Sequence, residues 1–175
     1  MHPIKLRFIL LLAALTALAL WMSSFSSYAA SNTKIQLTTT AAGPREIEET
    51  TAQAIARDYA KAWQAMSAAR QQNRPDLLAG MFTGYAQDEL TRAIKDQQAA
   101  NIRTRYTDRG HKLDAIFYSQ EGSALQLRDT AQVTIDVLDG DKVVHTEDAT
   151  INYLVLMTPA ADHWQVRKLQ AVPNF

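Results

Sequence analysis

The side chains best placed for acid–base chemistry cluster in the segment 129–147. Asp129 stands two residues before Ala131, and His145 and Glu147 stand an even number of residues before Ala149. If the segment forms strands, an even spacing places these side chains on one face with the apolar residues. A general base needs its pKa moved toward neutral pH by burial or by a charged neighbour. The three groups could therefore face an interior, or His145 and Glu147 could lie at a solvated tip.

Other kinds of chemistry have little support in the sequence. The four histidines are dispersed without metal-ligand spacing, and the aspartates around Gly140 lack the alternating acids and the distant glutamate of a calcium loop. No glycine-rich phosphate loop or Gly-x-Ser-x-Gly elbow occurs, and there is no cysteine. We therefore expect no metal, no cofactor, no disulfide and no thiol catalysis.

Hydrophobic periodicity indicates the strands that would position these residues. Residues 131–157 predict a long β-hairpin, because apolar and polar residues alternate along the first arm and less cleanly along the second. Asp139-Gly140 marks the turn. A two-residue loop would pair odd with even positions, so we predict a three-residue loop at 138–140. We also predict a strand at 111–120, a start at 123 for the strand that includes the first hairpin arm, and a strand at 162–172 with a bulge near Lys168. Together with the return arm of the hairpin, these make about four antiparallel strands.

Helical patterns precede these strands. Early acidic residues and apolar residues spaced by three and four predict a long amphipathic helix from Glu46 to about Gln72. A break at 73–76 leads to a short helix through Met81 or Phe82, and a third helix follows Gly84. Three helices followed by about four strands predict an α+β domain in which a strongly curved antiparallel sheet wraps the long helix.

A cationic stretch joins the helices to the first predicted strand. Residues 101–112 contain Arg103, Arg105, Arg109 and Lys112 but only one acid, Asp108. The stretch could bind an anion or a lipid headgroup. A solvated helix end and loop is the interpretation that we favour, because cations suit the negative end of a helix.

The N-terminus has the pattern of a membrane-targeting segment. Lys5 and Arg7 precede the uncharged apolar run 8–22, and small residues at 27 and 29 suit cleavage after Ala29. We predict a signal peptide or an uncleaved signal anchor at 1–30, a flexible tether at 31–45 and one folded domain at 46–175; a buried core helix is a weaker alternative to the first. Cleavage and anchoring both place the domain outside the cytoplasm: it would be periplasmic or extracellular, or anchored in the membrane with its C-terminal domain outside the cytoplasm.

The charge of the exported part disfavours nucleic acid as a partner. Residues 31–175 carry 16 basic and 18 acidic side chains, whereas the whole sequence carries 18 of each. A slightly acidic domain lacks the positive field that attracts a phosphate backbone.

The layout from Ile47 to Val172 resembles the nuclear transport factor 2-like superfamily, which includes the SnoaL-like proteins. The matching stretches are ARDYAKAWQAM at 56–66, FTGY at 82–85 and DHWQV at 162–166, where His163 replaces the glycine usual in a terminal "dG-W-k-v" strand. The resemblance implies a cone-shaped barrel of three helices and a strongly bent sheet. Within the superfamily the chain is similar to membrane-tethered, non-enzymatic members such as the C-terminal domain of plastid-division proteins.

The resemblance also implies what an enzymatic member would need. Ketosteroid isomerases and SnoaL-type polyketide cyclases hold an Asp or His base inside the cone. Here that base would be Asp129 or His145, in a cavity lined by Tyr59, Trp63 and Tyr153. No motif of these enzymes aligns well enough to transfer a catalytic residue. We therefore predict a non-catalytic extracytoplasmic binding or assembly domain, with a cyclase or isomerase as the alternative.

The outer side of the sheet is predicted to meet a partner. Leu154 and Leu156 alternate with the inward face of the return arm, and Leu169 alternates with Trp164 and Val166, so all three leucines need cover. A second copy of the chain or another protein would supply it. Residues 173–175 or the tether folding over the patch is the alternative.

Overall fold

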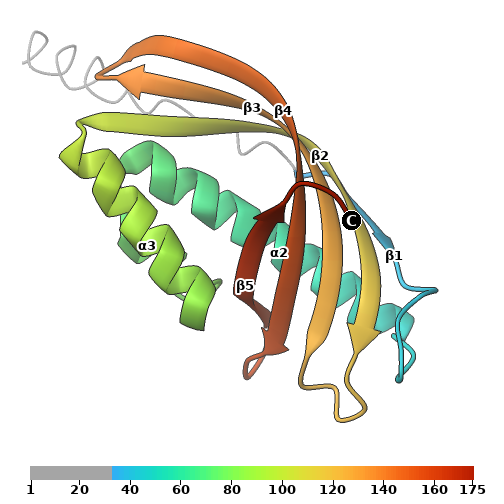
Figure 1. Ribbon diagram of the computed structural model, residues 1–175. Coiled ribbons are helices and arrows are strands. Elements are labelled where there is room, and N and C mark those ends of the chain that lie inside the picture. The colour runs from blue at the N-terminus through green and yellow to red at the C-terminus, as the bar shows by residue number, and fades with distance from the viewer. Residues whose placement is uncertain (1–32) are drawn as a thin grey trace, which may run out of the picture. The chain divides into compact units, whose positions relative to one another are not determined.

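The computed structural model describes residues 33–175, and the predicted signal or anchor segment at 1–30 lies outside the described residues (Figure 1). The domain is α+β, as predicted, with one five-stranded sheet in the order β1-β2-β3-β4-β5. The sheet curves over helix α2, Glu49–Gln72, whose inner side is buried (Figure 1). Within residues 33–175, no helix is both long enough and apolar enough to cross a membrane.

The helices follow the predicted periodicity, with one difference. Helix α2 buries residues at spacings of three and four, including Ile55, Tyr59, Trp63 and Met66. The predicted short second helix is a single 3-10 turn, η2, Pro75–Leu78. Helix α3, Gly84–Ala99, buries Leu90 and Ile94 against the same core. The described chain thus has two α-helices where we predicted three.

Four antiparallel strands form most of the sheet. They are β2, Ile102–Tyr118, β3, Leu125–Asp139, β4, Lys142–Pro159, and β5, Trp164–Val172. A fifth strand, β1, Ile35–Thr38, pairs in parallel with β2. This strand lies in the segment 31–45, which we predicted to be a flexible tether. The segment forms a strand because Ile35 and Leu37 alternate with polar residues and pack against the core. The cationic stretch also belongs to a strand, since β2 begins at Ile102.

The β3–β4 turn keeps the predicted pairing but forms it differently. Ile135 pairs with Glu147 and Ala131 pairs with Ile151, so odd positions do face odd positions. The loop nevertheless has two residues, Gly140 and Asp141, because β3 ends at Asp139 and β4 begins at Lys142. The extra residue that we predict in the loop lies instead in a bulge of β4, because Val137 pairs with His145 while Leu138 pairs with Val143.

Candidate functional site: a sealed carboxylate–histidine cluster

A polar cluster lies inside the core, between α2 and the curved sheet. The Tyr59 hydroxyl, from α2, donates a hydrogen bond to Asp129 Oδ2 at 2.7 Å. Nδ1 of His111, from β2, lies 3.0 Å from Asp129 Oδ1 and 2.9 Å from Oδ2. The side chains of His111 and Asp129 are both 0% exposed. Asp129 thus joins α2, β2 and β3 through two buried contacts.

Asp108 completes what we call the buried cluster, which consists of Tyr59, Asp108, His111 and Asp129. Oδ2 of Asp108 lies 3.4 Å from His111 Nε2, and the Asp108 side chain is only 8% exposed. Residues three apart on a regular strand point to opposite faces. A bulge at Arg109 brings these two side chains to the same face, because Asp108 pairs with Val133 while Gly110 pairs with Gln132.

The carboxylates keep His111 in its charged form. Burial by itself lowers the pKa of the imidazole, but contacts with Asp108 and Asp129 outweigh it and raise the pKa of His111 from 6.5 to about 9. Burial raises the pKa of Asp108, yet the contact with His111 brings it below the ordinary value. Burial and the charge of Asp129 raise the pKa of the Tyr59 hydroxyl well above 10. At neutral pH an imidazolium therefore lies between two acidic side chains, and Tyr59 is a neutral donor.

Aromatic rings close the buried cluster on its helix side. The Trp63 ring centroid lies 4.4 Å from that of His111, 5.8 Å from that of Tyr153 and 6.4 Å from that of Tyr106. Beyond these rings, a pocket of about 270 Å³ lies between α2, α3 and the sheet. Tyr106 and Tyr153 line this pocket, whereas Tyr59, Trp63 and Asp129 do not. Of the three predicted cavity residues, only Tyr153 therefore borders open space.

His145 does not join Asp129. Its side chain is 63% exposed and lies 3.9 Å from Glu147, on the part of β4 where residues 142–148 are all exposed. Strand β5 pairs with β4 only from Asn152 to Pro159, so the hairpin end has no strand beside β4 (Figure 1). Parity gave the correct face for His145, but no element covers that face there. The interpretation of His145 as a solvated hairpin residue fits this position.

His111 and Asp108 were missed as members of a site. His111 shares parity with the buried residues Leu113 and Ala115, which was an available signal. Asp108 had no such signal, because the bulge between it and His111 shifts the parity. Within the described residues, no group of three or more His, Cys, Asp or Glu side chains is arranged to hold a metal ion.

The predicted interface leucines occupy two different faces. Leu154 and Leu156 are half-buried and lie on the outer face, where Asn152 Nδ2 donates to the Pro173 carbonyl at 3.3 Å and Arg128 lies over the Phe175 ring. Leu169 instead packs against the core. The bulge predicted near Lys168 is present, since Met157 pairs with Val166 and Leu156 pairs with Lys168. We had placed Leu169 on the outer face beyond this bulge, and that assignment was wrong.

Structural comparison identifies the fold. The intermembrane space region of the chloroplast protein ARC6 aligns with a TM-score of 0.62 at 15% sequence identity, over 74% of this chain and 98% of that one. The chain has the nuclear transport factor 2-like fold. No family model matches the sequence. No curated protein matches it either.

Enzyme-like members of the nuclear transport factor 2-like fold align less well. A putative scytalone dehydratase from Novosphingobium aromaticivorans has a TM-score of 0.45 and 13% identity, over 66% of this chain and 83% of that one. ActVI-ORFA from Streptomyces coelicolor has a TM-score of 0.46 and 13% identity, over 66% and 94%. These values carry no information about activity.

Proposed function

We propose that the nuclear transport factor 2-like domain is a non-catalytic, extracytoplasmic binding or assembly domain, either secreted or tethered to a membrane. The non-catalytic part of this proposal rests on one observation. The acid–base cluster found inside the described core is closed off from solvent, because its side chains are buried. A general base must reach the proton that it removes, directly or through one water molecule. Asp129 and His111 are fully buried, and Asp129 already accepts a hydrogen bond from Tyr59.

The exported location rests on the N-terminal sequence. Lys5 and Arg7 precede an uncharged run of apolar residues, which is the order found in signal peptides and signal anchors. The ARC6 region with the same fold is named for an intermembrane space, a location that agrees with a domain outside the cytoplasm. Intact-mass measurement of the exported protein distinguishes the two forms, because a released chain begins at Ala30 and a tethered chain retains residues 8–22.

The partner in this proposal binds the outer face of the sheet around Leu154 and Leu156, and a second copy of the chain is the simplest partner. Both leucines are half-buried rather than covered, although the C-terminal residues lie beside them. Sedimentation of the full chain in neutral detergent, over a wide concentration range, tests self-association. We expect Leu154→Glu to weaken it and Thr150→Glu, an exposed position on the same strand and face, to leave it unchanged. A chain that stays monomeric and is indifferent to Leu154→Glu would exclude self-association through this face.

A cyclase or isomerase is the second candidate, and the buried cluster itself favours it. Clusters of ionisable groups with shifted pKa values occur often at active sites. Asp129 would be the base, and substrate would have to enter from the pocket beside Tyr106 and Tyr153 after Trp63 moves. His145 has no part in this alternative, because it lies in solvent.

The accessibility of His111 distinguishes the two candidates. We suggest recording histidine ring signals of the full chain by NMR while a soluble paramagnetic agent is added. Such an agent broadens signals near solvent whatever their protonation state. We expect His145 to broaden strongly, His163 to broaden, and His111 to remain sharp. If the His111 signals broaden as much as those of His145, the buried cluster is open and the enzymatic candidate gains.

A further inference from the structure

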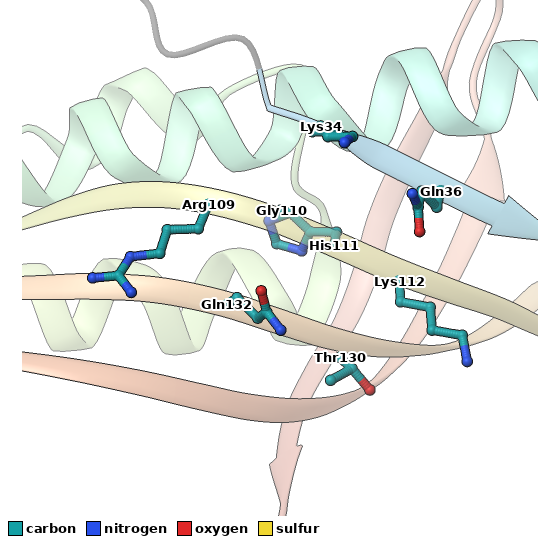
Figure 2. A pocket seen from close by; sticks show the side chains of 8 residues that line it. All are labelled: Lys34, Gln36, Arg109, Gly110, His111, Lys112, Thr130 and Gln132. Carbon is teal, nitrogen blue, oxygen red and sulfur yellow. The ribbon is translucent and has the colours of Figure 1, made fainter.

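A cationic pocket lies on the outer face of the sheet, and His111, a member of the buried cluster, is one of the residues that line it. It has a volume of about 290 Å³ and is formed by β1, β2 and β3 (Figure 2). Its lining includes no acidic residue and consists of Lys34, Gln36, Arg109, Gly110, His111, Lys112, Thr130 and Gln132. We propose that this pocket binds a phosphate-bearing anion. This binding site does not depend on the proposed function above.

The charges in the pocket are not balanced as they are elsewhere on this sheet. Arg103, Arg105 and Arg109 each form an ion pair with an acid of the β3–β4 hairpin, namely Asp141, Asp136 and Asp148. Lys34 and Lys112 form no ion pair within the described residues. Asp114, the next acid along this face of β2, stands opposite Arg128. Positive charge at the pocket therefore remains available to a ligand.

The bulge in β2 shapes the pocket. It inserts Arg109 between the Asp108 and Gly110 pairings, so that Arg109 reaches the outer face beside a residue that has no side chain. Gly110 has a φ of +150°, and a Cβ added there would lie 3.5 Å from the Lys34 carbonyl oxygen. A side chain would fit there in ordinary contact with Lys34, so it is the positive φ, rather than lack of space, that favours glycine at this position.

The donors in the pocket suit a phosphate. A lysine ammonium has three donor hydrogens, and no hydrogen bond engages those of Lys34 or Lys112 within the described residues. Arg109 uses only Nη2, for Thr134 and Asp148, which leaves Nε and Nη1 free to donate. A phosphate offers several strong acceptor oxygens to such a set of cations. The volume lies at the small end of ligand pockets, which favours a compact group over a large ligand.

Two sources could supply that phosphate, a lipid headgroup or a soluble phosphate. Only residues 23–33 separate Lys34 from the predicted membrane segment at 8–22. Even fully extended, this stretch spans at most about 40 Å. If the segment enters a membrane, the pocket stays within reach of the headgroups. The acids Asp114 and Asp148 oppose binding only weakly, because each faces an arginine.

Lysine acetylation of the full chain tests the proposal in two arms. One arm adds inorganic phosphate to the protein in neutral detergent. The other compares nanodiscs of phosphatidylcholine with nanodiscs that also contain phosphatidylglycerol. Mass spectrometry follows the rate at each lysine, and we expect Lys34 and Lys112 to be protected in at least one arm. Lys142 and Lys168, which lie outside the pocket lining, are the internal controls.

Variants show whether protection comes from the pocket. Lys112→Ala should raise the concentration of phosphate, or of phosphatidylglycerol, that half-protects Lys34 by about tenfold, because it removes one charge-assisted contact. Gln132→Ala, on the opposite wall, should weaken protection less, and Lys168→Ala should have no effect. Both pocket positions are exposed, so circular dichroism should show an unchanged fold.

Each outcome decides a point. Protection by inorganic phosphate identifies a soluble phosphate, and protection only in phosphatidylglycerol nanodiscs identifies a headgroup. The proposal is overturned if neither arm protects Lys34 and Lys112, if Lys142 and Lys168 are protected equally, or if Lys112→Ala leaves the protection of Lys34 unchanged.

Discussion

Neutralising His111 should destabilise the domain in a defined pH range. The folded-state pKa of about 9 lies above the value of 6.5 expected in the unfolded chain. A raised pKa contributes stability that is complete below pH 6.5 and is lost as pH rises through 9. The difference corresponds to roughly 3 kcal/mol of unfolding free energy. No discount for solvent screening applies, because the imidazole is 0% exposed.

Urea unfolding at pH 6 and at pH 9.5 measures this loss. Trp63, whose ring contacts His111, provides a fluorescence signal close to the buried cluster. Tyr59 and Tyr153 contribute little to this difference: burial raises the pKa of both hydroxyls above 10, so the stability linked to them is lost mainly above pH 10, the ordinary tyrosine value. His163 also has a raised pKa, from a contact with Asp162, but its side chain is 23% exposed. We expect His163→Gln to keep most of the pH dependence.

Two variants connect the pH dependence to the buried cluster. His111→Gln leaves the two buried carboxyl groups without their cation and should lower stability at pH 6 by about 3 to 5 kcal/mol. It should also remove most of the pH dependence. If it does not fold, Asp108→Asn provides the test, because losing one carboxylate lowers the pKa of His111 and moves the transition to lower pH. Equal stability of the natural protein at pH 6 and pH 9.5 would refute this account of His111.

Three further predictions concern single contacts. Tyr59→Phe removes the donor to buried Asp129 and should cost about 1 to 3 kcal/mol in urea unfolding, whereas Tyr153→Phe, whose hydroxyl forms no hydrogen bond within residues 33–175, should cost clearly less. Asp58→Asn weakens the acceptor that holds the Trp164 amide at 3.0 Å and should lower the stability of the domain at neutral pH. Burial raises the pKa of Asp58, but Arg57 and the Trp164 amide outweigh it and lower that pKa below the ordinary value. In the natural protein the stability that the Asp58 carboxylate contributes should therefore be lost below about pH 4 on acid titration. Gly110→Ala forces a side chain into a left-handed conformation and should lower the thermal midpoint, with a cost of about 1 kcal/mol or more; an unchanged midpoint would show that the bulge tolerates a side chain.

Periodicity predicted the parts of the fold in which each element is regular. The spacing along α2 placed Tyr59 and Trp63 in the core, and strand parity placed Asp129 inward. It also paired odd with odd positions across the hairpin. These predictions succeeded because burial of one face dominates the free energy of both helix and strand.

The predictions that failed mostly concern irregular backbone and the reach of neighbouring elements. One extra residue at Arg109 placed Asp108 beside His111, and one at Arg167 turned Leu169 inward. A bulge adds a single residue to a strand. The alternation of apolar residues can show that the strand switches its inward face, but it does not show at which residue the switch occurs. His145 shows a different limit, because its face was correct but β5 pairs with β4 only from Asn152 onward and the His145 side chain stays exposed.

The bulge at Arg109 links the interior of the sheet to its outer pocket. A buried ion pair is often no more stabilising than apolar residues of the same size, so the buried cluster need not exist for stability alone. Asp108 and His111 can meet only if one extra residue lies between their pairings. The same residue and Gly110 after it line the cationic pocket, together with His111. The buried cluster therefore fixes a register of β2 in which Arg109 and Lys112 border one hollow, and a shift of that register would dismantle both sites together.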